Sequence, residues 1–422
     1  MTLSDGDAAT VPLRREILVA LDEADPLARF RDQFALPRDT IYLDGNSLGA
    51  LPRRTAARIG QVIAQEWGQD LIRSWNSHGW IDLPLRLGDK IGRLIGAAEG
   101  QVAAADSTSV NLFKLLAAAL RLRPGRRTIL SETGNFPTDL YMAEGLAELL
   151  ERGHRLELVE KARIADAIDG DTAVVLLTHV DFRSGEIHDM RELTARAHAA
   201  GALGLWDLCH SAGAVPVELD ACKVDLAVGC GYKYLNGGPG APAFLYVAHR
   251  HQQATRQPLT GWLGHEAPFA FEPGYRPASG IRRMLAGTPA ILAMTALDCG
   301  IDLLLQADMA SLRRKSMIMG DLLIRLVEER CAGWEFALVS PRDAAQRGSH
   351  VAFSHDEGYA IMQALIARGV IGDFRAPDLM RFGLAPLYLG YADLWDAVET
   401  LRRIMADGVW NRPEYLKRAA VT

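Results

Sequence analysis

Two short apolar runs, each followed closely by a charged residue, constrain the fold of this chain most strongly. The runs cover residues 201–206 and 224–230, and both are typical of strands buried in a parallel sheet. Asp207 follows the first run directly, and Lys233 lies three residues beyond the second. Because open α/β sheets bind ligands at the carboxyl ends of their strands, these two side chains are predicted to share one ligand site.

An acid and a lysine at that edge suit a bound aldehyde cofactor. Lys233 can form a Schiff base with the aldehyde, and Asp207 can pair with a protonated pyridine nitrogen, so that the ring accepts electrons from a substrate carbanion. The pair therefore predicts pyridoxal 5'-phosphate (PLP). Each residue alone has a plainer interpretation, because a lysine in a glycine-rich turn is usually solvated and an aspartate after a strand usually forms a turn or a helix cap.

Two segments that open predicted helices are candidates for the rest of the cofactor site. Thr108 and Ser109 stand at a helix start, where hydroxyls and backbone N–H groups bind phosphate, although such a run alone is most often an ordinary N-cap. In the segment 135–139, Phe136 is a candidate to stack on the ring and Asp139 to reach its substituents. Pro137 and Asp139 are equally typical of plain helix initiation. His210 and Thr178 likewise have structural interpretations as a core histidine and a strand-end hydroxyl.

An amino-acid substrate would bring a carboxylate, which a guanidinium binds through two parallel hydrogen bonds. Arg381 lies at the end of a predicted strand in the last quarter of the chain and is the candidate for this role.

Composition narrows the classes of ligand. The chain has 422 residues, 49% of them hydrophobic, and a formal charge of −6, which argues against nucleic acid or an anionic membrane as the main partner. The five cysteines have neither the spacing of a zinc site nor the even count of a disulfide framework. No metal is therefore expected, and the protein is expected to lie in the reducing cytoplasm. The first apolar patch, residues 17–21, is too short for a signal or membrane segment.

Helices and strands alternate between residues 56 and 310, which predicts a large α/β domain with a mostly parallel sheet between helices. Helices are expected at 53–67, 85–95, 110–122, 139–152 and 190–200, and strands at 127–131, 155–159, 173–178, before 207 and near 229. The run 241–247 follows too closely for a crossover and is expected to be antiparallel. Residues 311–422 predict a smaller α+β domain with helices at 309–331, 358–368 and 391–406, grouped with an N-terminal arm, residues 1–55, that has helical pieces at 13–22 and 26–34. Its strands are expected near 336–339, at 348–353 and ending at 381–383.

Seven segments spread over nearly the whole chain resemble those of one enzyme family, the kynureninases, within the fold-type I, aspartate aminotransferase-like PLP enzymes. These segments are Tyr42-Leu-Asp-Gly-Asn-Ser-Leu-Gly49, Ile72-Arg-Ser-Trp-Asn76, Asn135-Phe-Pro-Thr-Asp139, Trp206-Asp-Leu-Cys-His-Ser-Ala-Gly213, Tyr232-Lys-Tyr-Leu-Asn-Gly-Gly238, Gly261-Trp-Leu-Gly-His265 and Met380-Arg-Phe-Gly383. The resemblance implies a seven-stranded sheet and the hydrolysis of L-kynurenine to anthranilate and L-alanine, a step in tryptophan breakdown. Whether that step serves catabolism or NAD biosynthesis stays open.

The resemblance also implies roles for individual residues. The implied catalytic residues are Lys233, Asp207 and Tyr232, the last as proton donor. The implied cofactor shell is Thr108, Ser109, Phe136, Pro137, Thr138, Asp139, Thr178, Asp207, His210, Tyr232, Lys233, Trp262 and Thr288, and the implied substrate contacts are Arg381, Asn46, Ser47 and Trp75. Trp262 and Thr288 would come from the partner subunit, which implies a homodimer. Trp75 stands where similar animal enzymes carry a histidine, which implies a preference for unhydroxylated kynurenine.

Two alternatives remain beside this prediction. A cysteine desulfurase or selenocysteine lyase has a similar order of motifs but needs a reactive cysteine on a mobile loop, and Cys331, expected at the end of a long helix, is the only candidate in the small domain. A catalytically silent regulatory protein of the same fold is the non-enzyme alternative, since fold alone never fixes function. A dehydrogenase is excluded because no GxGxxG opens a helix after a strand.

Overall fold

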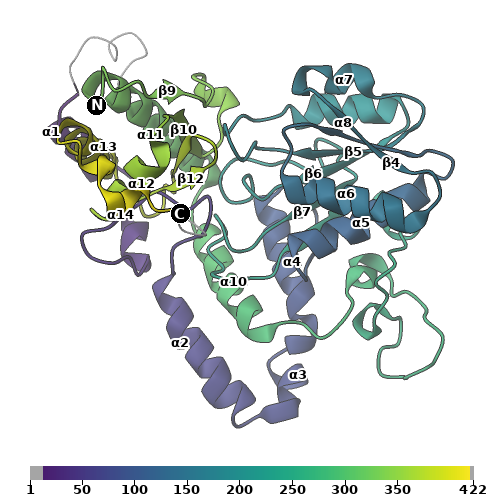
Figure 1. The fold of residues 1–422 in the computed structure, drawn as a ribbon. Coiled ribbons are helices and arrows are strands. Elements are labelled where there is room, and N and C mark those ends of the chain that lie inside the picture. The colour runs from purple at the N-terminus through teal and green to yellow at the C-terminus, as the bar shows by residue number, and fades with distance from the viewer. Residues whose placement is uncertain (1–12, 419–422) are drawn as a thin grey trace.

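A seven-stranded sheet forms the centre of the larger part of the computed structural model, which describes residues 13–418 (Figure 1). The strand order is β2-β8-β7-β6-β5-β3-β4. The strands are β2 (Val102–Ala104), β3 (Thr128–Glu132), β4 (Arg155–Val159), β5 (Thr172–Thr178), β6 (Leu203–Asp207), β7 (Leu226–Gly229) and β8 (Phe244–Val247). Only β8 runs antiparallel to its neighbours, as its short connection from β7 predicted.

The central strands are buried on both faces, which explains their continuous apolar sequences. Alternate residues of β5 enter two different cores: Val175 and Leu177 belong to one, Val174 and Leu176 to the other. Helices cover the sheet, namely α4 (Leu83–Leu94), α5 (Thr108–Leu122), α6 (Pro137–Leu150), α7 (Ile164–Ala167), α8 (Met190–Ala199) and α10 (Ile291–Leu304), with the short α9 (His249–Gln252) after β8. The prediction of a mostly parallel α/β domain is confirmed.

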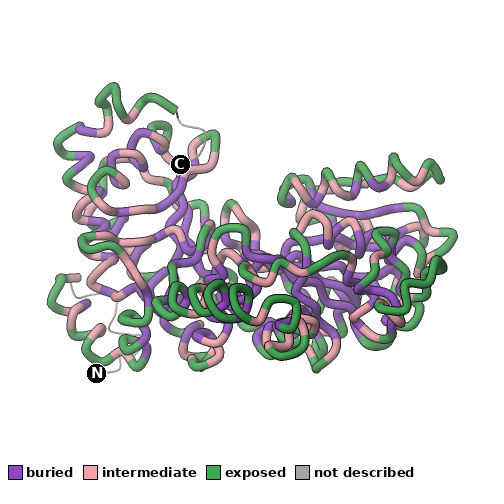
Figure 2. The backbone as a smooth tube through the Cα atoms, turned by 90° about the horizontal axis from the view of Figure 1, so that it is seen from below, coloured by how far each residue is buried: buried purple, intermediate pink, exposed green. Residues whose placement is uncertain are grey.

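The smaller part is built on a second sheet of order β12-β13-β10-β9, in which all pairs are antiparallel. Its strands are β9 (Ala337–Leu338), β10 (His350–Ser354), β12 (Asp373–Arg375) and β13 (Leu379–Gly383), and its helices are α11 (Met309–Arg330), α12 (Gly358–Ile366), α13 (Tyr391–Ala406) and α14 (Pro413–Leu416). Buried backbone gathers in two masses, one for each part of the molecule (Figure 2). The described chain ends lie with the smaller part (Figure 1).

The N-terminal arm lies against the smaller part. Helix α1 (Arg15–Glu23) contacts α13, and β1 (Ile41–Tyr42) pairs in parallel with β11 (Val370–Ile371). After the arm, α2 (Arg53–Gln61) continues as a π-helix, Val62–Trp67, and leads to the short α3 (Ser74–Ser77). The helix predicted over 53–67 is therefore present over that range, with π geometry in its last six residues. The α2–α3 segment projects from the body of the molecule (Figure 1).

Several elements were not predicted from the sequence. Strand β2 has three residues and follows a glycine turn, too short for a period of two to be visible. Helix α10 is apolar on most of its surface, so it lacks the amphipathic pattern of a surface helix. The piece predicted at 26–34 is a 3₁₀ helix, Ala28–Gln33. The other predicted helices and strands are present with boundaries shifted by a few residues.

Candidate functional site

A cavity of about 300 Å³ opens at the carboxyl ends of β5 and β6. We call it the cofactor cavity. Ten of the predicted site residues line it, together with three others: Ser107, Thr108, Ser109, Phe136, Thr138, Asp139, Thr178, Phe182, Asp207, Cys209, His210, Tyr232 and Lys233. The structure therefore joins Asp207 and Lys233 in one space, as the two strand ends predicted.

Two aspartates meet at the floor of the cofactor cavity. Asp207 is the last residue of β6 and stands beside Thr178, the last residue of β5, while Asp139 comes from the first turn of α6. Asp139 and Asp207 line the same cavity and are electrostatically coupled, and Asp139 accepts from the Thr178 hydroxyl at 3.4 Å. Burial raises the pKa of both carboxyls, and the charge of Asp207 raises that of Asp139 further.

These two carboxyls have too few hydrogen-bond donors for two buried charges. Asp207 accepts the backbone N–H of Cys209 at 2.7 Å, and Asp139 Oδ1 is buried with no partner among the described residues. A ligand with a cationic ring nitrogen would supply the missing donor and charge. The residues present therefore fit the pyridine end of PLP.

Lys233 reaches the cavity from the turn after β7. Its Nζ lies 2.9 Å from His210 Nε2, and the pKa of His210 is held well below its usual value by burial and by the charge of Lys233. The neutral imidazole can accept a hydrogen bond from the ammonium group. The turn is held by the N-terminal arm, since a Cβ on Gly49 would lie 2.3 Å from the Lys233 carbonyl oxygen, so only glycine permits this approach.

The opposite wall of the cavity suits a phosphate. Thr108 begins the fifteen-residue helix α5, and Ser107 caps it by accepting the N–H of Val110 at 3.3 Å. Asp106, directly before, would repel an anion, but its carboxylate is paired with the fully buried Lys114. Lys114 also donates to the Met284 carbonyl at 2.8 Å, which fixes this pair below the helix start.

Aromatic rings close the sides of the cavity. Phe136 caps the start of α6 and packs edge-on against Phe182, with ring centroids 5.2 Å apart. The ring centre of Tyr232 lies 5.8 Å from Lys233 Nζ, and burial raises the pKa of its hydroxyl, which stays protonated at neutral pH. Both positions agree with the expected cofactor wall.

Arg381 lies in a separate group of charged side chains on the smaller part, which we call the arginine cluster: Asp44, Ser47, Asp373, Arg375 and Arg381. The Arg381 guanidinium is buried and donates two hydrogen bonds to Asp373, from Nε at 2.7 Å and from Nη2. Its Nη1 donates to the carbonyl of Phe182, the residue whose ring lines the cofactor cavity. The predicted carboxylate clamp is thus adjacent to the cavity but already holds a carboxylate of its own chain.

Five further predicted residues do not line the cofactor cavity: Pro137, Trp75, Asn46, Trp262 and Thr288. Pro137 begins α6, and Trp75 packs edge-on against Trp80 with ring centroids 6.0 Å apart. Asn46 is buried with neither side-chain amide atom partnered among the described residues. Trp262 lies in the 3₁₀ helix Trp262–Gly264, on a stretch with other exposed aromatic rings.

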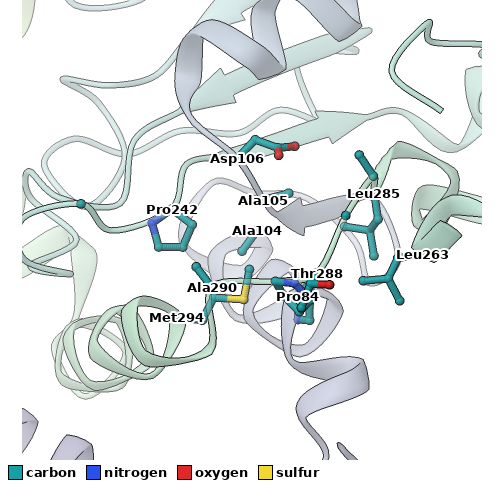
Figure 3. Close-up of a pocket in the computed structure, with 14 residues that line it drawn as sticks. Pro84, Ala104, Ala105, Asp106, Pro242, Leu263, Leu285, Thr288, Ala290 and Met294 are labelled. Atoms are coloured by element: carbon teal, nitrogen blue, oxygen red, sulfur yellow. The ribbon is translucent and has the colours of Figure 1, made fainter. Parts of the chain in front are cut away.

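Thr288 lines a second cavity, of about 260 Å³, near the start of α10 (Figure 3). Its walls are largely apolar, with Leu285, Pro242 and Met294 around it and Asp106 at one end. Asp106 directly precedes the predicted phosphate site, so this cavity lies behind that loop.

Sequence reasoning missed three residues that complete the cofactor cavity and the arginine cluster. Ser107 stands one position before the predicted pair and has the hydroxyl expected of an N-cap, so the signal was present. Phe182 lies in a loop without a motif, and Asp373 is an aspartate eight residues before Arg381 whose pairing depends on the register of β12 against β13. That register could not be read from the sequence.

The cysteine at the end of the long helix is not placed for nucleophilic chemistry. Cys331 is the C-cap of α11, is 3% exposed and has its pKa raised to about 12 by burial. A thiol of this kind carries almost no thiolate at neutral pH. Among residues 13–418, no helix is long and apolar enough to cross a membrane.

Known proteins resemble this chain in sequence and in fold. The family model of the kynureninase C-terminal domain matches residues 312–401. The kynureninase of Burkholderia pseudomallei is 57% identical over 413 residues, which covers 97% of this chain and 99% of that protein. Among solved structures, a cysteine desulfurase of Escherichia coli has a TM-score of 0.75 at 18% identity, covering 90% of this chain and 98% of its own.

A second solved structure, of the lyase C-DES with glycine linked to its PLP cofactor, has a TM-score of 0.76 at 17% identity and covers 88% of this chain and 98% of its own. These structural likenesses show the shared fold of fold-type I PLP enzymes. The identity to the curated relative, sustained over almost the full length of both proteins, shows more: this chain belongs to the kynureninase family.

Proposed function

We propose that this protein hydrolyses L-kynurenine to anthranilate and L-alanine with PLP as its cofactor. The single observation that carries this conclusion is the meeting of Lys233, Asp207 and the start of α5 around one cavity in a chain 57% identical to a curated kynureninase. PLP, when bound, supplies an aldehyde for the substrate amine and an electron-accepting ring.

The residues of the cofactor cavity divide this work. Lys233 anchors the cofactor and, once displaced by the substrate amine, moves the proton at the substrate Cα. Asp207 keeps the ring nitrogen protonated, and Asp139, whose pKa is raised by burial and by the charge of Asp207, lines the cavity with it. Thr108, Ser109 and the N-terminal turn of α5 bind the phosphate, and Phe136 covers the ring, with Thr138, Thr178 and His210 completing the wall.

Tyr232 is the proposed proton donor for release of L-alanine. Its hydroxyl keeps its proton because burial raises its pKa, and it stands beside Lys233 at the cavity wall. A neutral phenol at this place can donate a proton to the carbon left after anthranilate departs and can recover it from water.

Arg381, with Asn46 and Ser47 nearby, is proposed to receive the substrate carboxylate. Support comes from the contact between the Arg381 guanidinium and the carbonyl of Phe182, which ties this group to the cavity wall. Trp75 is proposed to set the preference for kynurenine without a ring hydroxyl.

A homodimer with shared sites is proposed as the working assembly. Trp262 and Thr288 do not line the cofactor cavity of their own chain, and large apolar side chains are exposed on two segments. On the 259–275 stretch Phe269 is 63% and Phe271 is 82% exposed, and on the projecting α2–α3 segment Ile72 is 77% exposed. A second copy covering both segments would bury these side chains and bring Trp262 and Thr288 to its partner's phosphate site.

The domain division and location follow as proposals. We place the large PLP-binding domain at residues 56–310 and group 1–55 with 311–422, because α1 and β1 pack against elements of the smaller part. A cytoplasmic location is supported by five free cysteines. A role in tryptophan catabolism or in NAD biosynthesis would follow from the reaction.

One assay tests the function directly. Purified protein loaded with PLP and mixed with L-kynurenine is expected to produce anthranilate fluorescence and one equivalent of L-alanine, with slower turnover of 3-hydroxykynurenine. Incubation with L-cysteine is the control for the desulfurase alternative, and the buried Cys331 predicts no sulfide. Sulfide release without anthranilate would overturn the proposal.

A further inference from the structure

The arginine cluster contains two aspartates with very different surroundings. Asp373 receives two hydrogen bonds from Arg381, one from Ser47 and an ion pair from Arg375 at 2.8 Å. Asp44, in the turn after β1, is half-buried, and its Oδ1 is buried without a hydrogen-bond partner among the described residues. Ser47 has one hydroxyl proton, which is donated to Asp373, so one oxygen of the Asp44 carboxylate is left buried without a donor.

The charge balance of the cluster depends on Asp44. Arg375 and Arg381 carry two positive charges, and Asp373 carries one negative charge because the bonds and charge of Arg381 lower its pKa despite its burial. With Asp44 neutral, the cluster has one positive charge left for an incoming carboxylate. With Asp44 ionised, that charge is cancelled and an incoming carboxylate meets a second anion.

Asp44 is the group whose titration changes the net charge of the cluster near neutral pH, because the titratable groups that face it from neighbouring elements keep their charge states. Burial and the charge of Asp373 raise the pKa of Asp44 to about 7, against the weaker lowering effects of Ser47, Arg381 and Arg375. The remaining titratable neighbours are phenols whose pKa values burial raises, so they stay neutral: Tyr42, Tyr234 and Tyr388.

We propose that Asp44 is a positioning residue that must carry a proton when the arginine cluster binds the substrate carboxylate, so that carboxylate binding takes up a proton at this side chain. The inference rests on the proposed function, since it assumes that Arg381 receives the carboxylate of kynurenine. It adds a residue that acts through the net charge of the cluster and not through contact with the reacting atoms.

Binding and protonation at Asp44 are therefore linked. A bound carboxylate is an additional anion near Asp44 and makes its proton harder to remove. The ligand then binds more weakly as the pH rises above the range where free Asp44 ionises, by at most about tenfold for each pH unit. Replacement of Asp44 by asparagine keeps the size and the hydrogen-bonding carbonyl but removes the titration.

The test uses the PLP-loaded enzyme and 4-oxo-4-phenylbutanoate, which keeps the carboxylate and aryl ketone of kynurenine but has no amine to react with the cofactor. Isothermal titration calorimetry between pH 6 and 8.5, in buffers of different ionisation enthalpy, gives both the affinity and the number of protons taken up. In the wild type we expect binding about tenfold weaker at pH 8.5 than at pH 6.5, with proton uptake approaching one near pH 8. Asp44→Asn is expected to bind at pH 8.5 as tightly as the wild type does at pH 6.5.

Matched controls separate the possible failures. Asp39→Asn changes an exposed aspartate five residues upstream and should retain the pH dependence of the wild type. Wild-type binding without proton uptake, or an Asp44→Asn variant that keeps the full pH dependence, would overturn the role of Asp44 even if kynurenine is hydrolysed. Equal binding of the neutral amide, 4-oxo-4-phenylbutanamide, would instead overturn the assignment of the arginine cluster as the carboxylate receptor, and the role of Asp44 with it.

Discussion

The cofactor cavity and the arginine cluster each contain two aspartates next to basic side chains, but they differ in how many donors their buried aspartates receive. In the cluster, Asp373 is surrounded by donors and its pKa is lowered, mainly through Arg381 once burial is overcome. In the cavity, Asp207 and Asp139 both have raised pKa values because burial outweighs the few donors present. The Arg381–Asp373 pair is satisfied without a ligand, whereas the two cavity aspartates have only the charge of Lys233 and too few hydrogen-bond donors.

The arginine cluster is therefore arranged before a ligand binds, whereas the cofactor cavity is not yet satisfied. A guanidinium held by its own carboxylate keeps its geometry before substrate arrives, which reduces the ordering cost of binding. Two buried acids with too few hydrogen-bond donors are unfavourable as anions, and a cationic ring would stabilise them. The apoenzyme is therefore expected to depend on the cluster for its stability and to gain stability at the cavity only when PLP binds.

Removal of the lysine should have the largest effect, because it takes the one reactive amine from the cavity. Lys233→Ala is expected to abolish the visible absorbance of covalently held cofactor and to lower turnover by about 10⁴-fold, the upper range for a positioned acid–base group. Absorbance spectra and the anthranilate assay measure the two losses. The exposed Lys417→Ala is the matched control and should change neither; a Lys233→Ala enzyme with full activity would refute the whole assignment.

Asp373→Asn tests whether the cluster is complete in the apoenzyme. The change leaves Arg381 buried without its charged partner, which typically costs about 3–5 kcal/mol, reduced here to the extent that Asp44 ionises in its place. Thermal unfolding of the apoenzyme at pH 7 should show a clear loss of stability, with no loss in the exposed Asp356→Asn. If the two variants unfold at the same temperature, the cluster is not the preorganised unit described above.

The sequence predicted the cavity much better than the cluster, and the reason lies in how each is assembled. Asp207 and Thr178 end apolar strands and Lys233 lies in the turn after a third, so the common edge of a parallel sheet brings them together in any structure with that strand order. The cluster joins a turn after β1 to β12 and β13, about 330 residues later, through an antiparallel register. Neither the pairing of Arg381 with Asp373 nor the position of Asp44 beside it has a local signal.

The same contrast explains which residues of the substrate site stay predictions. Trp262 and Thr288 were named through the family resemblance and do not line the cavity of their own chain, because their proposed place requires a second subunit. Trp75 sits on the projecting α2–α3 segment, whose position against substrate depends on the same assembly. The residues around Lys233 and Asp207 could be placed from one chain, but the proposed places of Trp262, Thr288 and Trp75 depend on contacts with a second subunit.

The smallest expected effect concerns the stability of the apoenzyme at high pH. It is also the sharpest test of the contrast, because replacing the buried Asp207 or the buried Asp225 by asparagine should change that stability in opposite directions. The pKa of Asp207 is raised by burial, so the folded apoenzyme releases this proton at a higher pH than the unfolded chain, which loses it near pH 4. Its stabilising contribution is present below that pH and is lost as pH rises towards the folded pKa. Asp207→Asn should therefore match or exceed the stability of the wild-type apoenzyme at pH 8, although turnover falls on the order of 10²-fold.

Asp225 supplies the matched control in the same sheet. Its pKa is lowered because hydrogen bonds from His251, the Gly204 N–H and His198 together outweigh its burial, so its stabilising contribution is present above about pH 4 and is lost as the pH falls further. Asp225→Asn should accordingly destabilise the apoenzyme at pH 8, where Asp207→Asn does not. A comparable loss of unfolding temperature in both variants would mean that Asp207 is already held as a stabilised anion before the cofactor binds. The contrast drawn above between Asp207 in the cavity and Asp373 in the arginine cluster would then be wrong.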